Sequence, residues 1–126
     1  MKKVLMSIKP EFANSIFEGT KLYEYRKYKL GRKDIVSVVV YATEPVSKII
    51  GEFDIEKVLE ETPQRLWELT HNGSGITEEF FYKYFENRNV SFAYKISNPQ
   101  RYSEPRLLSD CYPGVKPPQT HRYVDE

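Results

Sequence analysis

The stretch 19–27 carries the densest set of chemically useful side chains in this sequence, with both signs of charge next to aromatic rings. A glycine after an apolar helical face commonly ends a helix, so we expect a helix to end where this stretch begins and a strand to follow. Alternate side chains of a strand share a face, which places Glu24 with Arg26 and Lys21 with Tyr23. The pattern therefore predicts a carboxylate beside a guanidinium on one face and a lysine beside a tyrosine on the other.

These charges suit the binding of an anionic or hydrogen-bonding ligand. Lys21 is placed to meet a phosphate as a mobile point charge. Arg26 can form paired hydrogen bonds with a carboxylate, a phosphate or a guanine edge, and Glu24 can orient Arg26 or accept from an exocyclic amine. The alternative is a structural role, in which Glu24 and Arg26 form an ion pair that holds the fold together.

Side chains from other segments extend this candidate site. Ser7 and Lys9 follow the first predicted strand, and they line the same cleft if the first two strands are neighbours. Tyr23, Tyr25, Tyr41 and Tyr94 offer rings for base stacking, which contributes roughly 1–3 kcal/mol for each stacked base. The alternative for the tyrosines is that they fill the rim of a small barrel.

Length and composition predict one domain over residues 1–126, rich in aromatic residues. The single Cys111 excludes an internal disulfide, and no cysteine or histidine spacing indicates zinc, so we expect no metal and no cofactor. No apolar run approaches the ~20 residues of a membrane helix. The apolar run that begins at Val4 is too short for the apolar region of a signal peptide. These features predict a soluble cytoplasmic protein that does not bind membranes.

The net charge of +1 conceals an uneven distribution along the chain. Residues 1–33 hold nine lysines and arginines against three glutamates, whereas residues 44–86 hold ten acidic groups against four basic ones. Such polarity is typical of an anion-binding face opposite a solvated acidic face. The other interpretation is that the two blocks mingle in three dimensions.

Hydrophobic patterning predicts strands alternating with a few helices, hence an α+β domain. We expect strands over 4–8, 21–27, 35–42, 47–58 and 90–96, with another near 101–102, and helices over 10–18, 63–69 and 77–85. Gly51 within a strand indicates a bulge or a close backbone contact. From about residue 103 the prolines predict a mostly irregular tail that packs over the body.

The aromatic residues at 80–85 have helical spacing, and we interpret them as core. If they lie instead in an exposed contiguous patch, they favour a module that only binds other proteins.

The sequence also resembles the ASCH domain family, which belongs to the wider PUA-like superfamily. Gly19, Lys21, Glu24 and Arg26 match the family signature G-x-K-x-x-E-x-R. The similarity continues along the chain in the same order, through residues 7–10, 39–45, 50–53, 92–96 and 117–123.

The resemblance implies a small mixed β-barrel of about five or six strands with two or three peripheral helices and a cleft beside the signature strand. By analogy with PUA domains, the resemblance implies that the protein binds RNA or a nucleotide. The sequence does not indicate the oligomeric state of the protein. Lys21, Glu24 and Arg26 then form the centre of the site.

An enzymatic function is the main alternative. Some ASCH-like proteins hydrolyse the acyl amide of an acetylated cytidine, with a threonine nucleophile where this chain has Glu24. A carboxylate replaces that hydroxyl poorly, but Glu24 could act as a general base on water while Lys21 or Arg26 stabilises the oxyanion. Other family members cleave RNA, for which Lys21 and Tyr23 are candidate acid–base groups. The sequence leaves open whether the protein is catalytic.

Overall fold

The predicted strands pair into one mixed sheet in a computed structural model that describes residues 2–125. The six strands are β1 (Lys2–Ile8), β2 (Tyr23–Arg26), β3 (Ser37–Ala42), β4 (Lys48–Glu61), β5 (Ser91–Arg106) and β6 (His121–Asp125). Their order is β2-β5-β4-β3-β1-β6, with β1 and β3 parallel and all other neighbours antiparallel. The predicted α+β class with about six strands is confirmed.

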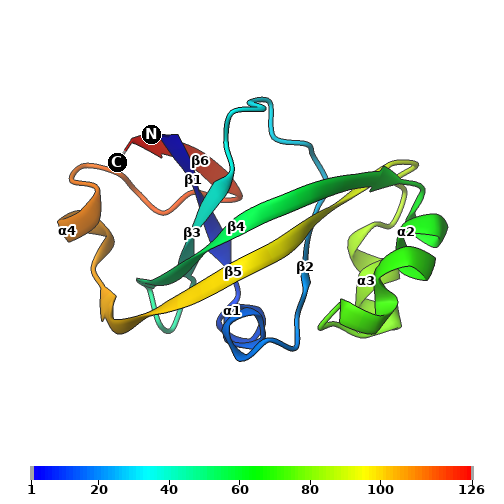
Figure 1. Cartoon of the computed structure of the whole chain (residues 1–126), viewed down its shortest axis with the longest axis horizontal. Coiled ribbons are helices and arrows are strands. Elements are labelled where there is room, and N and C mark those ends of the chain that lie inside the picture. Colours follow the sequence, from blue (N-terminus) through cyan, green and yellow to red (C-terminus); the bar gives the residue numbers. More distant parts are fainter. Residues whose placement is uncertain (1, 126) are drawn as a thin grey trace.

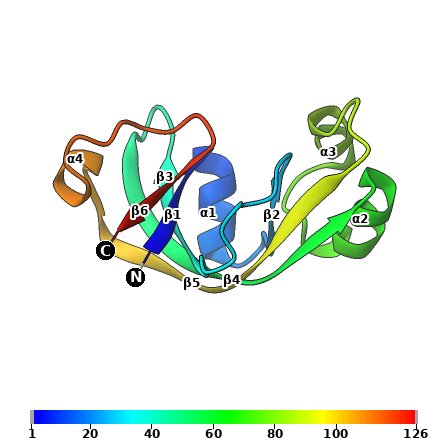
Figure 2. The ribbon, with the colours of Figure 1, turned by 90° about the horizontal axis from the view of Figure 1, so that it is seen from above.

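The antiparallel pair β4–β5 forms a long ribbon that crosses the molecule and curves around α1 (Pro10–Glu18), as Figures 1 and 2 show. The register between β4 and β5 shifts between Ile49 and Gly51, as predicted for a bulge. A Cβ on Gly51 would lie 2.5 Å from the ring of Phe17. The absence of a side chain therefore lets α1 approach the sheet closely.

The end strands of the sheet, β2 and β6, are not joined by a backbone ladder in the described part of the chain. The sheet is thus barrel-like in its curvature but not closed by backbone hydrogen bonds. Side chains bridge the opening instead, and one of these contacts is the hydroxyl of Tyr123, which accepts a 3.0 Å hydrogen bond from the N–H of Gly31.

The end of α1 and the starts of the next two α-helices lie at residues that the sequence signals indicated. Gly19 adopts a left-handed φ of 86° and ends α1, where a side chain would be strained. The hydroxyls of Thr62 and Thr77 cap α2 (Pro63–Thr70) and α3 (Glu78–Tyr84) by accepting from backbone N–H groups. None of the described helices is long and apolar enough to cross a membrane.

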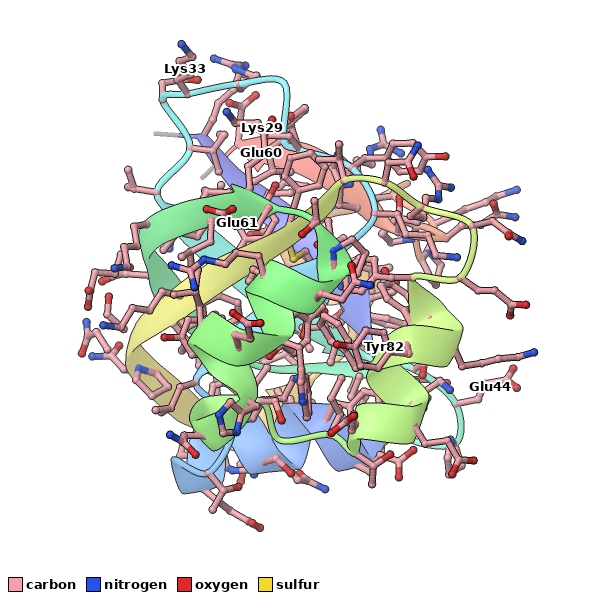
Figure 3. All side chains as sticks on the ribbon, turned by 90° about the vertical axis from the view of Figure 1, so that its right-hand side faces the viewer. Lys29, Lys33, Glu44, Glu60, Glu61 and Tyr82 are labelled. Carbon is pink, nitrogen blue, oxygen red and sulfur yellow. The ribbon has the colours of Figure 1, made fainter. Side chains whose placement is uncertain are left out.

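The remaining helices cover the two ends of the β4–β5 ribbon (Figure 1). At one end α2, a 3₁₀ turn η1 (His71–Gly73) and α3 lie together, with Tyr82 between α2 and α3 (Figure 3). At the other end lies the short α4 (Leu108–Cys111), near both chain termini.

Apolar side chains cover both faces of the sheet, and β3 is buried along its whole length. On one face Val38 and Val40 pack with α1, while on the other Val39 and Tyr41 pack with Leu108 of α4. A third cluster surrounds Phe81 between α2, α3, β2 and β5.

The C-terminal part of the chain is more regular than predicted. We expected a mostly irregular tail from about residue 103, but β5 continues to Arg106, α4 follows, and β6 pairs with β1. The prolines do not prevent this, because β2 pairs only with residues 92–95 of β5. Beyond them one edge of β5 has no ladder partner, so a missing N–H costs little.

Candidate functional site

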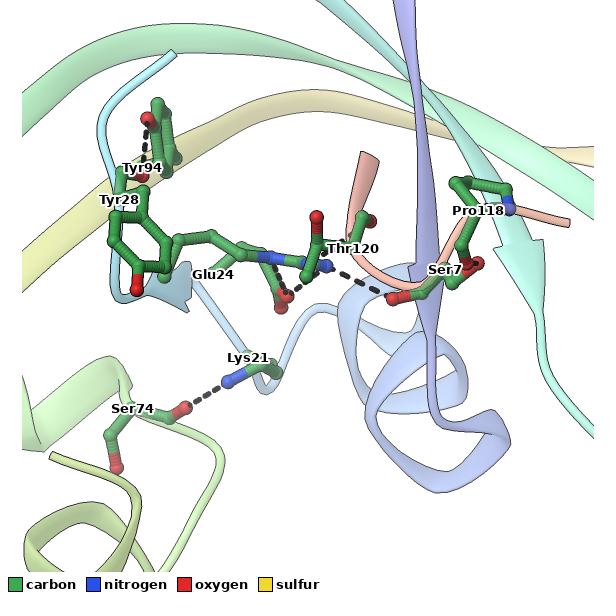
Figure 4. A network of polar contacts seen from close by, with 9 residues as sticks. Ser7, Lys21, Glu24, Tyr28, Ser74, Tyr94, Pro118 and Thr120 are labelled. Carbon is green, nitrogen blue, oxygen red and sulfur yellow. Dashed lines mark hydrogen bonds and ion pairs between the residues drawn. The ribbon is translucent and has the colours of Figure 1, made fainter. Parts of the chain in front are cut away.

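The serine and the four charged residues predicted for the site surround one cavity of about 470 Å³. They come from β2, from the connection before it and from the end of β1: Ser7, Lys9, Lys21, Glu24 and Arg26. The first two strands are not neighbours in the sheet, because β1 and β2 lie on opposite sides of the β3–β4–β5 segment. The curvature of the sheet nevertheless brings the end of β1 close to β2, and Figure 4 shows Ser7, Lys21 and Glu24 around the same space.

Lys21 is 2% exposed, which is unusual for a lysine. Its ammonium donates a 2.8 Å hydrogen bond to the carbonyl oxygen of Ser74 in the loop before α3 (Figure 4). Its Nζ also lies 4.9 Å from the ring centroid of Tyr25 and 5.4 Å from that of Phe12. Burial lowers the pKa of Lys21 below its usual value, and the charge of Glu24 opposes this shift. The side chain is therefore a desolvated cation in an aromatic environment.

We expect the buried charge of Lys21 to make the free energy of unfolding depend on pH. Because its pKa is lowered in the folded state, the unfolded chain binds more protons between that lowered pKa and 10.5. Stability should therefore rise with pH across this range, by at most about 1.4 kcal/mol per pH unit for one proton. Urea unfolding of the wild type and Lys21→Met from pH 7 to 10.5 should show the wild type gaining stability relative to the variant. Parallel curves would contradict this.

Glu24 and Arg26 form the ion pair that the sequence suggested as an alternative to ligand binding. Nε and Nη2 of Arg26 lie 3.0 and 2.9 Å from Oε2 of Glu24, and both side chains are largely buried. Arg26 also donates to the backbone carbonyls of Ser7 (3.0 Å) and Thr120 (3.2 Å). It thus connects β2 to β1 and to the segment before β6, which closes the barrel-like fold where no ladder does.

Two aromatic side chains that the sequence analysis assigned to the core line the cavity instead. Phe80 and Tyr84, four residues apart on α3, face the cavity, while Phe81 and Phe85 are 0% and 2% exposed in the core. The ring of Phe80 makes an edge contact with Phe12 of α1. The sequence did carry the signal, because two apolar pairs at i, i+4 spacing define two adjacent helix faces.

Lys9 lies at the mouth of this cavity and is exposed. Its Nζ is 5.3 Å from the ring centroid of Phe80 and 6.0 Å from that of Phe12. The cavity thus offers one buried cation, one exposed cation and aromatic walls. This arrangement suits an anion that carries a flat apolar group.

Of the four tyrosines predicted for base stacking, Tyr25 lines the cavity and the other three do not. Tyr41 lies in the apolar cluster beneath α4, and Tyr94 is 1% exposed with its hydroxyl accepting from the N–H of Leu30. Tyr23 packs against the cluster around Phe81. Packing holds these three rings away from the cavity, whereas the ring of Tyr25 lies in its wall and is 6% exposed.

The strand-face prediction was right for Glu24 with Arg26 and wrong for Lys21. β2 begins only at Tyr23, so alternation does not extend back to Lys21, whose side chain reaches the cavity from the preceding connection. Among residues 2–125, no three or more histidine, cysteine, aspartate or glutamate side chains gather closely enough to hold a metal ion.

Comparisons with known proteins agree with this architecture. The family model described as "ASCH domain" matches residues 6–104. The ASCH domain-containing ribonuclease of Zymomonas mobilis subsp. mobilis is 26% identical over 121 residues, which cover 94% of this chain and 82% of that protein. The crystal structure of ASCH from Zymomonas mobilis has a TM-score of 0.89 and 25% identity, and the match covers 98% of this chain and 88% of that one.

A second kind of relative is much longer than this chain. The large ribosomal subunit protein uL22 of Ureaplasma parvum serovar 3 is 25% identical over 123 residues, or 96% of this chain. The chain spans only 39% of that protein's length.

Proposed function

Because the chain belongs to the ASCH domain family, we propose that it binds RNA or a nucleotide in the cavity beside β2. The observation that carries this proposal is the buried ammonium of Lys21 in a cavity with aromatic walls. An ammonium has three donors, and within residues 2–125 the one hydrogen bond that it makes is to Ser74. A phosphate oxygen would satisfy the remaining donors and compensate for the desolvated charge.

The rest of the cavity supports a nucleotide over a simple anion. Phe80 and Tyr84 provide rings against which a base can pack, and Lys9 provides a second cation at the mouth. Glu24 contacts Arg26 only through Oε2, so in this proposal Oε1 accepts from a base amine. Arg26, which the sequence suggested as a phosphate ligand, acts here as a positioning residue for Glu24 and for the cavity wall.

We expect Lys21→Met and Lys9→Ala each to weaken RNA binding. Loss of either cation should lower affinity, and loss of a phosphate contact should reduce the slope of log K against log salt by about 0.7. The measurement is titration of a labelled single-stranded RNA with each variant at several salt concentrations. Lys83→Ala is the matched control, because Lys83 is an exposed lysine on the outer side of α3, paired with Glu86.

Each result of these titrations bears on the proposal. Weakened binding by both cavity variants, with Lys83→Ala like the wild type, would support the cavity as the site. Equal effects of all three substitutions would indicate nonspecific charge attraction. If the wild type binds neither RNA nor nucleotides at any salt concentration, the proposed function is wrong.

Ribonuclease activity is the second candidate, favoured by the similarity to the ASCH domain-containing ribonuclease of Zymomonas mobilis. Cleavage by the neighbouring 2′-hydroxyl forms a bond from O2′ to phosphorus and breaks the bond to O5′. One group must take the O2′ proton and another must give a proton to O5′. Lys21, with its lowered pKa, is suited to one of these roles, whereas Tyr23 does not line the cavity. Denaturing gels of the titrated RNA would reveal shortened products if the protein cleaves.

The other two alternatives gain less support. A hydrolase of acylated nucleosides would need Glu24 as a general base, but its carboxylate is already paired with Arg26. A module that only binds proteins would need an exposed aromatic patch, but Phe81 and Phe85 are buried, and Phe80 and Tyr84 line the cavity.

A further inference from the structure

An exposed tyrosine lies directly beyond the cavity, at the end of β2. Tyr28 is 61% exposed, and it follows Arg26 by two residues, a span of at most about 7 Å along the chain. Between them, the Nζ of Lys27 lies 4.8 Å from the ring centroid of Tyr84, which lines the cavity. Lys27 therefore contacts the aromatic wall of the cavity, and Tyr28 is its neighbour in the chain on the surface beyond.

The ring of Tyr28 is held in place by a residue distant in sequence. Nη2 of Arg88 donates a 2.9 Å hydrogen bond to the Tyr28 hydroxyl, and the guanidinium carbon lies 4.8 Å from the ring centroid. Arg88 is itself anchored, because its N–H donates to the carbonyl of Phe85 at the end of α3. We call Lys27, Tyr28 and Arg88 the rim platform.

The surroundings of the rim platform are strongly basic. Residues 26–33 contain five lysines and arginines and no carboxylate. Three of these cations are paired, Arg26 with Glu24, Lys29 with Glu60 and Arg32 with Asp34. Within the described chain, the contacts of Lys27 and Arg88 are with aromatic rings and a hydroxyl rather than with carboxylates. Figure 3 shows Lys29 beside Glu60, with Lys33 further out on the same loop.

We propose that the rim platform binds the nucleotide adjacent to the one in the cavity, so that the ligand is single-stranded RNA of at least two nucleotides. This inference depends on the proposed function of the cavity. An exposed ring fixed by an arginine is a surface on which a base can stack, and Lys27 lies where the connecting phosphate would pass. Single-stranded RNA fits best, because a base within a duplex does not present a free face to Tyr28.

The test compares a short ligand with a longer one. Wild-type protein, Tyr28→Ala, Tyr28→Phe and Arg88→Ala are titrated with nucleoside monophosphates and with a labelled single-stranded 8-mer RNA. Arg65→Ala is the matched control, because Arg65 is an exposed arginine of α2 that pairs with Glu68. We expect Tyr28→Ala to weaken 8-mer binding about tenfold or more while monophosphate binding stays unchanged. Tyr28→Phe keeps the ring and should retain most of the affinity.

The outcomes separate the two proposals. If the wild type binds both ligands and Tyr28→Ala binds the 8-mer as tightly as the wild type does, the rim-platform proposal is wrong and the cavity proposal stands. If Tyr28→Ala weakens the monophosphates as much as the 8-mer, the inferred division between cavity and rim is wrong. If the wild type binds neither ligand, the cavity proposal fails as well. Binding of poly-glutamate with the same dependence on Tyr28 would indicate an acidic protein partner and overturn the RNA assignment.

Discussion

Replacement of Arg26 by methionine is expected to lower the free energy of unfolding by about 3–5 kcal/mol. The substitution would leave the buried carboxylate of Glu24 without its ion-pair partner and would remove the guanidinium donor from the carbonyls of Ser7 and Thr120. Methionine preserves most of the apolar volume, so the loss reports the polar contacts rather than a cavity. Urea unfolding at pH 7 measures the change.

Two further variants make this result specific. Arg65→Met removes an arginine from an exposed pair with Glu68, and we expect a loss of no more than about 0.5 kcal/mol. The double variant Glu24→Gln, Arg26→Met removes the unpaired charge, so it should recover part of the stability lost in Arg26→Met. If Arg26→Met lowers the free energy of unfolding by less than about 1 kcal/mol, Arg26 does not stabilise the fold. That result would favour a direct contact between Arg26 and the ligand.

The expected result would give Arg26 both a structural role and a role at the site, which the sequence analysis treated as alternatives. Arg26 fixes the carboxylate of Glu24 at the cavity, and the same guanidinium ties β2 to the end of β1. Loss of RNA binding in an Arg26 variant would therefore not identify a ligand contact. For this reason the binding tests use Lys9 and Lys21, because Lys9 is exposed and Lys21 makes one hydrogen bond with the fold where Arg26 makes three.

The pairing of Glu24 with Arg26 could be predicted, because two residues on one strand face are constrained by local geometry alone. The position of Lys21 could not, because its partner Ser74 is 53 residues away and lies in the loop that joins η1 to α3. Such a contact depends on how α2 and α3 dock against the ribbon. No local pattern in the sequence contains that information.

The buried position of Tyr41 shows why the sequence could not indicate which tyrosines line the cavity. β3 is buried on both faces, so its sequence lacks the polar–apolar alternation that would indicate which side chains face solvent. Its β-branched residues identify a central strand but not the layer into which each side chain points. Tyr94, on β5, has the same difficulty, since residues 91–94 of that strand are all buried.

Substitution of Gly75 by alanine is expected to destabilise the protein by about 2–5 kcal/mol and to weaken RNA binding. Gly75 has a left-handed φ of 68°, and a Cβ built there would lie 2.5 Å from Cβ and 3.0 Å from Cα of Lys21. The conformational strain costs alanine about 1–2 kcal/mol, and overpacking typically adds about 1–3 kcal/mol. Because the clash includes the backbone of Lys21, rotation of its side chain cannot relieve it. The loop carrying Ser74 must move away from the ammonium.

Gly114→Ala is the control that isolates the contact with Lys21. Gly114 has a φ of 81°, but no atom lies within 4 Å of a Cβ built there, so only the conformational cost of about 1–2 kcal/mol should appear. Thermal or urea unfolding of both variants, with RNA titration of each, separates strain from displacement. If Gly75→Ala lost no more stability than Gly114→Ala and bound RNA normally, the tight seating of Lys21 against this loop would not matter for the site. A larger loss together with weakened binding would show that the position of Lys21 depends on the missing side chain at residue 75.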